Sequence, residues 1–335
     1  MPPLKLKLHK SFKLLEKEVE KKSIPGGILG GVNSEGERYI YCCGDAMITP
    51  KKKAMALSTW FDLASLTKVF FTTIEIINEA QKGSFKLDDP LTKILPDLRQ
   101  YNENCWERKV TFRQCLGHQT NFPAVEPLYT YGQDQTTLRA FILQRAWKKE
   151  QPKYSDINYI MLGLALERLK KRPISKINAG WGFSFLPNKE TCAATEFCSW
   201  RGKIIEGMVH DENAFALGSA GHAGLFGTMT SALDFALDML TKITLSNDTI
   251  KIIRTPLSKK RTHGWERPYK GWSGGDNCNG TVIGHTGFTG TGIWIDFERE
   301  LAWCLFTNRV HPSRFNSNSI NKIRRNIGNI MCEVS

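Results

Sequence analysis

The stretch Phe61-Asp62-Leu63-Ala64-Ser65-Leu66-Thr67-Lys68 decides how the rest of the chain is interpreted. The apolar run 69–77 follows it and predicts a loop that turns into a buried helix. Ser65 and Lys68 are three residues apart, so on a helix they share one face, with Cβ atoms about 5–6 Å apart. A buried lysine with a lowered pKa can take the proton of a serine hydroxyl, and the N–H groups of a first helical turn suit an oxyanion. Because Ser-x-x-Lys also occurs by chance, the catalytic interpretation depends on partners elsewhere.

Two further stretches contain candidate partners. Tyr154-Ser155-Asp156 precedes the apolar run 160–166, at a second predicted loop-to-helix junction. A tyrosine there could act as a base or proton relay, although a core tyrosine with a satisfied hydroxyl would give the same pattern. The glycine-rich stretch 284–292 contains His285 on a predicted strand. Its glycines would let a substrate approach the backbone, or would simply form a turn.

In order, Ser65-x-x-Lys68, Tyr154-Ser155-Asp156 and His285-Thr286-Gly287 resemble the three-motif signature of serine β-lactamases and penicillin-binding proteins. The tyrosine-containing second motif is similar to that of the class C β-lactamase, DD-peptidase and esterase branch. The resemblance covers nearly the whole chain. Segments 87–91 and 110–123 also resemble the family, and four more resemble a subgroup of β-lactamases, esterases and muropeptide amidases, namely 200–202, 210–214, 221–226 and 307–312.

The resemblance implies a role for each motif residue. Ser65 would be the acylated nucleophile, Lys68 its activator, and Tyr154 the general base in acylation and deacylation. The backbone N–H groups of Ser65 and Phe288 would form the oxyanion hole. His285 would position a substrate carboxylate or tune Tyr154.

Asp156 departs from the family pattern, which has an asparagine at this place. Asparagine donates hydrogen bonds as well as accepting them, whereas an ionised aspartate only accepts. The exchange argues against binding of a β-lactam side-chain carbonyl and favours an ester or amide substrate. By resemblance, Asp156, Thr286 and Gly287 contact the substrate.

Three other places contain candidate polar residues. His222, in a glycine-rich loop, would line the pocket or belong to a structural turn. Arg201 could pair with a substrate carboxylate, although an ion pair within the protein is the commoner role of an arginine. His210-Asp211-Glu212 lacks a second histidine at helical spacing, so no metal is assigned, and no cofactor is expected.

The composition is that of a globular protein. The chain has 335 residues, of which 41% are hydrophobic and 24% charged, and no apolar run approaches the roughly 20 residues that cross a bilayer. The net charge of +13 is scattered in small lysine clusters without interleaved aromatics, such as 51–53 and 259–261, so we expect solvated surfaces and no nucleic-acid partner. The expected partner is a small-molecule or peptide-like substrate; the oligomeric state is not predicted.

The cysteines and the N-terminal residues indicate the cellular compartment in which the protein is expected. Nine cysteines fit neither a zinc site nor a regular disulfide framework, so buried reduced thiols are expected. Residues 1–10 have no continuous apolar segment of the kind found in secretory signals. Both observations predict a cytoplasmic protein, unless a leader was removed.

Strand patterns occur at both ends of the chain, and helical patterns lie between them. A helix is predicted at 10–22, a hairpin at 27–32 and 38–43, three strands at 281–286, 292–296 and 301–307, and a final helix at 319–334. The expected fold class is α/β (α+β), β-lactamase/transpeptidase-like, with an antiparallel sheet flanked by the terminal helices. Residues 1–75 and 255–335 would form the sheet subdomain, and 76–254 an inserted, mostly helical subdomain.

The leading functional hypothesis is a serine hydrolase that forms an acyl-enzyme on Ser65 and cleaves an ester or amide, with cell-wall-derived muropeptides as a candidate substrate. The first alternative is a β-lactamase or DD-carboxypeptidase. The second is a non-catalytic scaffold or ligand sensor that retains the fold.

Overall fold

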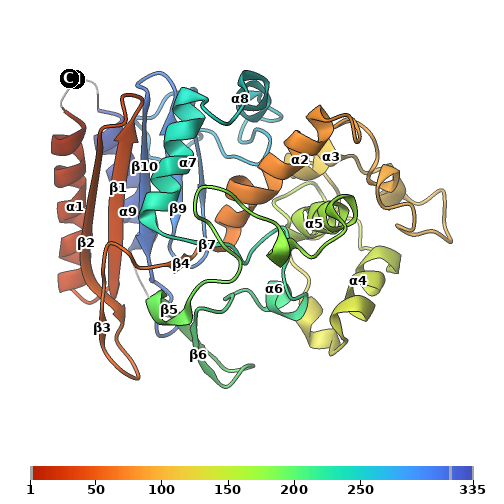
Figure 1. Ribbon diagram of the computed structural model, residues 1–335, viewed down its shortest axis with the longest axis horizontal. Coiled ribbons are helices and arrows are strands. Elements are labelled where there is room, and N and C mark those ends of the chain that lie inside the picture. Colours follow the sequence, from red (N-terminus) through yellow and green to blue (C-terminus); the bar gives the residue numbers. More distant parts are fainter. Residues whose placement is uncertain (1–2, 317–318, 334–335) are drawn as a thin grey trace.

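The computed structural model describes residues 3–316 and 319–333 and places a six-stranded antiparallel sheet beside a mostly helical region (Figure 1). The strand order is β3-β2-β1-β10-β9-β8. The strands are β1 (Gly26–Asn33), β2 (Arg38–Met47), β3 (Lys53–Ala54), β8 (Val282–Thr286), β9 (Gly292–Asp296) and β10 (Leu301–Thr307).

The centre of the sheet joins the two ends of the chain. β1 pairs antiparallel with β10, with Gly27 opposite Thr307 and Val32 opposite Ala302. β2 continues the sheet on one side, and β9 and β8 continue it on the other. The predicted fold class is therefore confirmed, together with the N-terminal hairpin and the C-terminal three-strand meander.

Helices cover both faces of the sheet. α1 (Leu4–Glu20) and α9 (Ile320–Met331) pack on one face, and α7 (Met229–Thr241) packs on the other (Figure 1). α1 begins earlier than the predicted residue 10 because Leu4, Leu8 and Leu15 belong to one buried stripe that faces the sheet. No helix within residues 3–316 and 319–333 is long and apolar enough to cross a bilayer.

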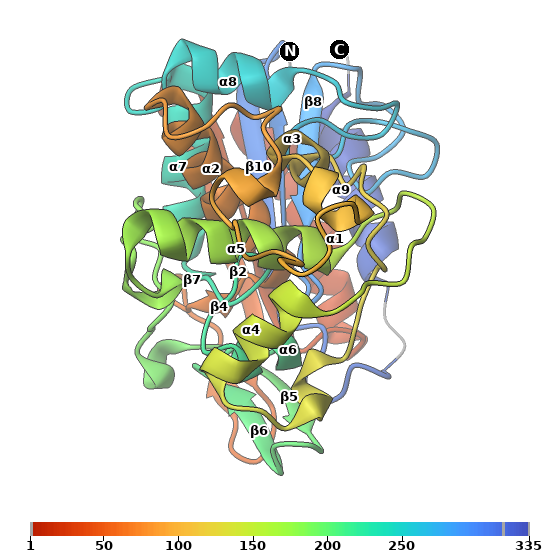
Figure 2. The ribbon, with the colours of Figure 1, turned by 90° about the vertical axis from the view of Figure 1, so that its right-hand side faces the viewer.

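The helical region surrounds α5 (Asp156–Lys170), which crosses the middle of Figure 2 and is buried from residue 157 to 166. Its other helices are α2 (Thr73–Gln81), α3 (Phe112–Leu116), α4 (Gln135–Gln144), α6 (Glu212–Ala216) and α8 (Asn247–Arg254). Two small strand pairs lie near it, β4 (Phe61–Asp62) with β7 (Phe226–Gly227) and β5 (Ala194–Cys198) with β6 (Lys203–Glu206). The division of the chain at 76 and 254 stays a prediction, and α7, inside that range, packs on the sheet.

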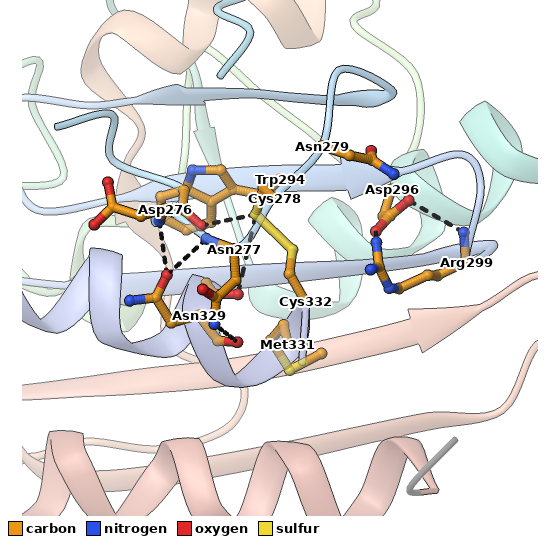
Figure 3. Close-up of a disulfide and its surroundings, with 12 residues drawn as sticks. Asp276, Asn277, Cys278, Asn279, Trp294, Asp296, Arg299, Asn329, Met331 and Cys332 are labelled. Carbon is orange, nitrogen blue, oxygen red and sulfur yellow. Dashed lines mark hydrogen bonds and ion pairs between the residues drawn. A yellow bond between two sulfur atoms is a disulfide. The ribbon is translucent and has the colours of Figure 1, made fainter. Parts of the chain in front are cut away.

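Cys278 and Cys332 form a disulfide between the loop before β8 and the end of α9 (Figure 3). Beside it, Oδ1 of Asn329 accepts hydrogen bonds from the backbone N–H groups of Asp276 (2.7 Å) and Asn277 (3.1 Å). The expectation that all cysteines are reduced is thus wrong for this pair. The two cysteines are 54 residues apart and only the fold brings them together. The free cysteines are Cys42, Cys43, Cys105, Cys115, Cys192, Cys198 and Cys304.

Candidate active site

Ser65 lies on a tight turn directly after the short strand β4. The turn is a 3₁₀ segment, Ala64–Leu66, in which Ala64 has a φ of 47°. This left-handed conformation is uncommon for a residue with a Cβ. A π-helical turn, Lys68–Thr72, follows and leads into α2. The predicted helix is therefore present, but its first turns are 3₁₀ and π rather than α.

The buried carboxylate of Asp62 holds this turn in place. It accepts hydrogen bonds from the backbone N–H groups of Ala64 (2.8 Å) and His210 (2.6 Å). Burial raises the pKa of Asp62 to about 6, and the two N–H groups oppose this rise. The hydroxyl of Thr289 donates to the backbone carbonyl of Asp62 (2.8 Å), so the turn is also tied to the loop between β8 and β9.

Lys68 is fully buried beside Ser65. Its Nζ donates to Ser65 Oγ (3.0 Å) and to the backbone carbonyl of His222 (3.0 Å), and it lies 2.8 Å from Oδ1 of Asp156. It also lies 5.1 Å from the ring centroid of Tyr154. The fold thus brings together the residues of the first two sequence motifs, which come from the turn after β4 and from the start of α5.

The protonation states of these groups follow from burial and from their mutual charges. Burial alone would lower the pKa of Lys68, but the charges and hydrogen bonds of Asp156 and Tyr154 raise it above its usual 10.5. Burial raises the pKa of Tyr154, and the charge of Lys68 only partly opposes the rise. At neutral pH Lys68 is therefore an ammonium and Tyr154 a neutral phenol. The expected lowering of the lysine pKa is wrong because a carboxylate lies in contact with it.

His285, on β8, is a neutral imidazole. Its Nδ1 lies 3.0 Å from the backbone carbonyl oxygen of Thr286, which can only accept, so Nδ1 carries the proton and Nε2 presents a lone pair. Burial, with the positive charges of Arg261 and Lys68, lowers the pKa of His285 well below 6.5. Its ring centroid is 6.0 Å from that of Tyr154, so the third motif lies beside the second.

Two residues that line the cavity have backbone N–H groups without a hydrogen-bond acceptor in the described part of the chain. Neither the amide of Ser65 nor that of Phe288 donates a hydrogen bond to any residue that the structure describes. Both residues line the same cavity. Free amides at the wall of the cavity that contains the nucleophile are suited to hold a developing oxyanion.

The cavity has a volume of about 580 Å³. Its lining includes two arginines and four carboxylates, and the arginines are paired: Arg261 with Glu266 (3.0 Å) and Arg314 with Glu212 (2.6 Å). The cavity therefore does not share the positive charge excess of the whole chain. Its lining residues are Ala64, Ser65, Val125, Tyr154, Asp156, His210, Asp211, Glu212, Ala223, Arg261, Glu266, His285, Thr286, Phe288 and Arg314.

Two residues that the sequence did not single out contact Tyr154. The ring of His118 lies 4.4 Å from the ring of Tyr154, and its Nδ1 accepts a hydrogen bond from the backbone N–H of Ser155 (3.1 Å). The guanidinium of Arg261 lies 4.9 Å from the centroid of the tyrosine ring. Arg261 was expected on a solvated surface with Lys259, but its side chain is only 16% exposed. The family-like stretch 110–123 was the one signal that pointed to His118.

The remaining predicted site residues lie at different distances from the cavity. Thr286 lines it. Gly287 follows Thr286 in a turn where a Cβ would meet Oγ1 of Thr291 and the carbonyl of Leu63, so only glycine fits. His222 offers its backbone carbonyl to the lysine, while its buried imidazole Nε2 lies 2.8 Å from a carboxylate oxygen of Asp211.

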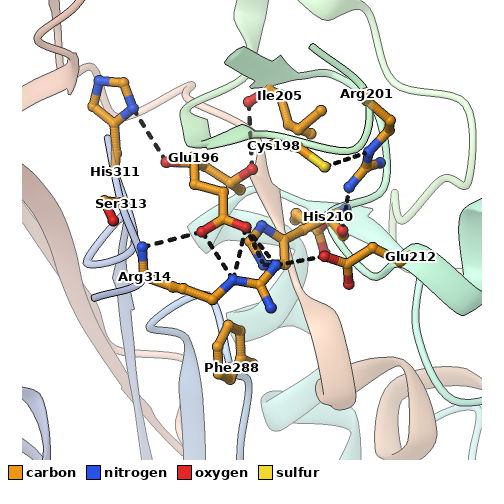
Figure 4. A network of polar contacts seen from close by, with 12 residues as sticks. Glu196, Cys198, Arg201, Ile205, His210, Glu212, Phe288, His311, Ser313 and Arg314 are labelled. Atoms are coloured by element: carbon orange, nitrogen blue, oxygen red, sulfur yellow. Dashed lines mark hydrogen bonds and ion pairs between the residues drawn. The ribbon is translucent and has the colours of Figure 1, made fainter. Parts of the chain in front are cut away.

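Arg201 and Arg314 support the loops around the cavity. Arg201, which is not among the lining residues, donates to the backbone carbonyls of Val209 (2.6 Å) and His210 (2.5 Å). Arg314 lies between the carboxylates of Glu196 and Glu212, with its guanidinium 5.4 Å from the ring of Phe288 (Figure 4). Phe288 thus forms the edge of the cavity against a fixed network of charges.

The described part of the chain contains no evident set of metal ligands. Within residues 3–316 and 319–333, no group of three or more His, Cys, Asp or Glu side chains is arranged to hold a metal ion. His210 and Glu212, the residues that could have suggested a site, instead contact the guanidinium of Arg314.

Comparison with known proteins identifies relatives over most of the chain. The family model described as Beta-lactamase matches residues 12–324. An N-acetylmuramyl-L-alanine amidase of Bacillus subtilis (strain 168) is 26% identical over 362 residues, which covers 91% of this chain and 81% of the relative. A putative D-alanyl-D-alanine carboxypeptidase of Escherichia coli (strain K12) is 28% identical over 313 residues, which covers 76% and 70%.

Solved structures share the fold at low sequence identity. Simvastatin synthase (LovD) from Aspergillus terreus superposes with a TM-score of 0.73 at 16% identity, covering 97% of this chain and 98% of that one. A class C β-lactamase from Rhodobacter sphaeroides gives 0.71 at 17% identity, covering 96% and 98%. The family match over residues 12–324 agrees with the resemblance seen in the three motifs, and the chain belongs to the beta-lactamase family of serine hydrolases.

Proposed function

We propose that this protein hydrolyses an ester or amide through an acyl-enzyme on Ser65. The observation that carries the proposal is the contact between Ser65 Oγ and Nζ of the buried Lys68 (3.0 Å), at the wall of a cavity of about 580 Å³. Tyr154, beside them, is the proposed base. The N–H groups of Ser65 and Phe288 are the proposed oxyanion donors.

At neutral pH Lys68 is mostly an ammonium and Tyr154 a phenol. The reactive form of the enzyme is the one in which this pair has lost one proton to the solvent and Tyr154 is a phenolate. Ser65 Oγ then attacks the substrate carbonyl carbon, its proton moves to the phenolate of Tyr154, and the carbonyl oxygen becomes an oxyanion. As the oxyanion collapses, Tyr154 gives this proton to the departing alcohol or amine. Water repeats the sequence on the acyl-enzyme: Tyr154 takes its proton, and the acid leaves as Ser65 recovers its hydrogen.

The substrate class is proposed to be a peptide-like fragment of the cell wall. The names of two relatives, an N-acetylmuramyl-L-alanine amidase and a putative D-alanyl-D-alanine carboxypeptidase, support it. Asp156 supports an ester or amide over a β-lactam, because its carboxylate is held by Lys68 and only accepts hydrogen bonds. A carboxylate at this point also favours a substrate that donates a hydrogen bond there.

Compartment and partners remain part of the proposal. Seven free thiols support a reducing, cytoplasmic location, whereas the Cys278–Cys332 disulfide is of a kind that oxidising compartments preserve. No nucleic-acid partner is proposed.

The test is the mass of the intact protein after exposure to a fluorophosphonate, a penicillin and a muramyl peptide in turn, beside Ser65→Ala. We expect a fluorophosphonate adduct that Ser65→Ala lacks, and release of products from the muramyl peptide. A lasting penicillin adduct on Ser65 would favour a penicillin-binding DD-carboxypeptidase instead. The absence of any Ser65-dependent adduct would refute the hydrolase and favour a non-catalytic scaffold.

A further inference from the structure

Arg324, on α9, is a buried cation that the proposed reaction does not use. The residue is 5% exposed, and within the described residues no carboxylate lies at ion-pair distance from its guanidinium. Burial, with the nearby charge of Arg309, lowers the pKa of Arg324 to about 9, while the charge of Glu266 partly opposes this, so Arg324 is still charged at neutral pH. Burying a charge without a counter-ion in contact is unfavourable, so the groups that hold it are informative.

Two hydrogen bonds of Arg324 go to backbone carbonyls in the turn between β8 and β9, and a third, longer one goes from Nη1 to Oδ1 of Asn321 (3.4 Å). Nη2 donates to the carbonyl oxygens of Gly287 (3.0 Å) and Thr291 (2.7 Å). The same turn is closed by the N–H of Gly287 on the carbonyl of Thr291 (2.9 Å) and by the N–H of Gly290 on the carbonyl of Gly287 (3.2 Å). One guanidinium therefore bridges both sides of the turn.

The carbonyl of Gly287 belongs to the same peptide unit as the N–H of Phe288. A trans peptide unit is planar, and its C=O and N–H point in opposite directions. A group that fixes the carbonyl oxygen therefore also fixes the direction of the N–H. Arg324 therefore contacts the carbonyl end of the peptide unit whose N–H is a proposed oxyanion donor.

The next peptide unit is held by a second arginine. Nε of Arg309 donates to the carbonyl of Phe288 (2.9 Å), and its guanidinium lies 4.8 Å from the phenylalanine ring. Cations on carbonyl oxygens also polarise the attached N–H groups and make them better donors. Both peptide units that flank the Cα of Phe288 are thus bound to guanidinium groups.

We propose that Arg324 is a positioning residue that orients the Gly287–Phe288 peptide unit, so that the N–H of Phe288 points at the developing oxyanion. Arg309 supports the following unit in the same way. This inference rests on the proposed function, in which Ser65 forms the acyl-enzyme. An arginine that only tied α9 to the sheet would affect folding stability, but not transition-state binding.

The experiment compares Arg324→Met, Arg324→Lys and the matched control Arg325→Met. Arg325 is the next residue on α9, and its exposed guanidinium pairs with Asp276 at the surface (2.6 Å). The measurements are kcat and KM for p-nitrophenyl acetate, inhibition by phenylboronic acid, which adds to a reactive serine as a tetrahedral anion, and the thermal midpoint. Ser65→Ala is measured in parallel.

We expect Arg324→Met to lower kcat about tenfold or more with KM within about twofold, since removing one oxyanion donor outright costs about 10²–10³. Boronic acid affinity should fall by the same factor, because the adduct carries the negative oxygen. Arg324→Lys should recover part of both, and Arg325→Met should match the wild type. If Arg324→Met does not fold, the test rests on Arg324→Lys. The inference then requires that kcat and the boronic acid affinity of Arg324→Lys fall together.

Two results overturn the inference in distinguishable ways. Turnover that persists in Ser65→Ala would refute the proposed function itself. Turnover that depends on Ser65 but is unchanged in the folded Arg324 variants, or that changes only through KM or the thermal midpoint, would refute the positioning role alone.

Discussion

Replacing Asp156 with asparagine should move the pH dependence of acylation to lower pH and speed the reaction at neutral pH. The carboxylate of Asp156 lies 2.8 Å from Nζ of Lys68 and raises the pKa of both Lys68 and Tyr154. Both groups therefore hold their protons more strongly than they would beside a neutral amide. The amide keeps the size of the side chain and removes only its charge.

The size of the effect follows from the distance. Two unit charges 2.8 Å apart interact by about 6 kcal/mol at an effective dielectric constant of about 20. The side chain of Asp156 is 19% exposed, so water screens part of this energy. If only a quarter of this energy, about 1.5 kcal/mol, acts on the proton that must leave, the reactive form becomes about ten times more abundant at neutral pH. We therefore expect kcat/KM at neutral pH to rise about tenfold.

The assay is kcat/KM for p-nitrophenyl acetate across about pH 5 to 10, since the acid limb of this profile reports the base of the free enzyme. Asp156 raises the pKa of the proposed base, so its removal must shift that limb downward. The rate of fluorophosphonate labelling gives an independent measure of the nucleophile. Asp276→Asn, which removes a surface carboxylate paired with Arg325, is the charge-matched control and should leave the profile unchanged.

A limb that stays in place or moves to higher pH in Asp156→Asn would refute the reasoning. Either result would mean that the charge of Asp156 does not control the proton that leaves before Ser65 attacks. The same conclusion would follow if Asp276→Asn produced an equal shift, because the effect would then be one of net charge.

Other substitutions test the rest of the molecule. Lys68→Ala and Tyr154→Phe should each lower the acylation rate at least about 10²-fold, and a wild-type rate of fluorophosphonate labelling in either would contradict its role. Gly221→Ala should lower the free energy of unfolding by about 1–3 kcal/mol in a denaturant titration, because its Cβ would overlap the backbone carbonyl of Tyr159; unchanged stability would show that the loop yields. Cys278→Ser should cost about 4 kcal/mol in oxidised protein, for a sequence separation of 54, and nothing in reduced protein; equal stabilities under both conditions would count against the disulfide.

The fold could be predicted from the sequence where local patterns and chain order agree. Alternating apolar runs around the turn at 33–36 predicted β1 and β2, and the runs on either side of residues 297–300 predicted β9 and β10. The start of α1 was missed because its first turn alternates leucines with lysines, a pattern that shows its buried stripe only against the sheet. The disulfide was missed because its two cysteines meet only after β8 and α9 are in place.

The same distinction, between contacts that local sequence predicts and contacts that depend on the fold, applies to the candidate site. Ser65 and Lys68 are three residues apart, so their contact could be predicted from local geometry. The raised pKa of Lys68 could not, because it depends on Asp156, which lies 2.8 Å away only once α5 is packed. His118 and Arg261 come from separate segments and meet at Tyr154, so no spacing in the sequence indicated either contact.

The two buried cations beside the site should therefore affect the reaction in different ways. Lys68 is held by the carboxylate of Asp156 and by the phenol of Tyr154, the proposed base, so its surroundings can set the pH at which the nucleophile becomes active. Arg324 is held by backbone carbonyls and by the amide oxygen of Asn321, none of which carries a charge, and its own pKa of about 9 lies above the neutral range. Removing Asp156 should move the acid limb of the pH profile. Replacing Arg324 should lower kcat/KM by about the same factor at every pH and leave the position of that limb unchanged, because Arg324 supplies geometry and not proton affinity.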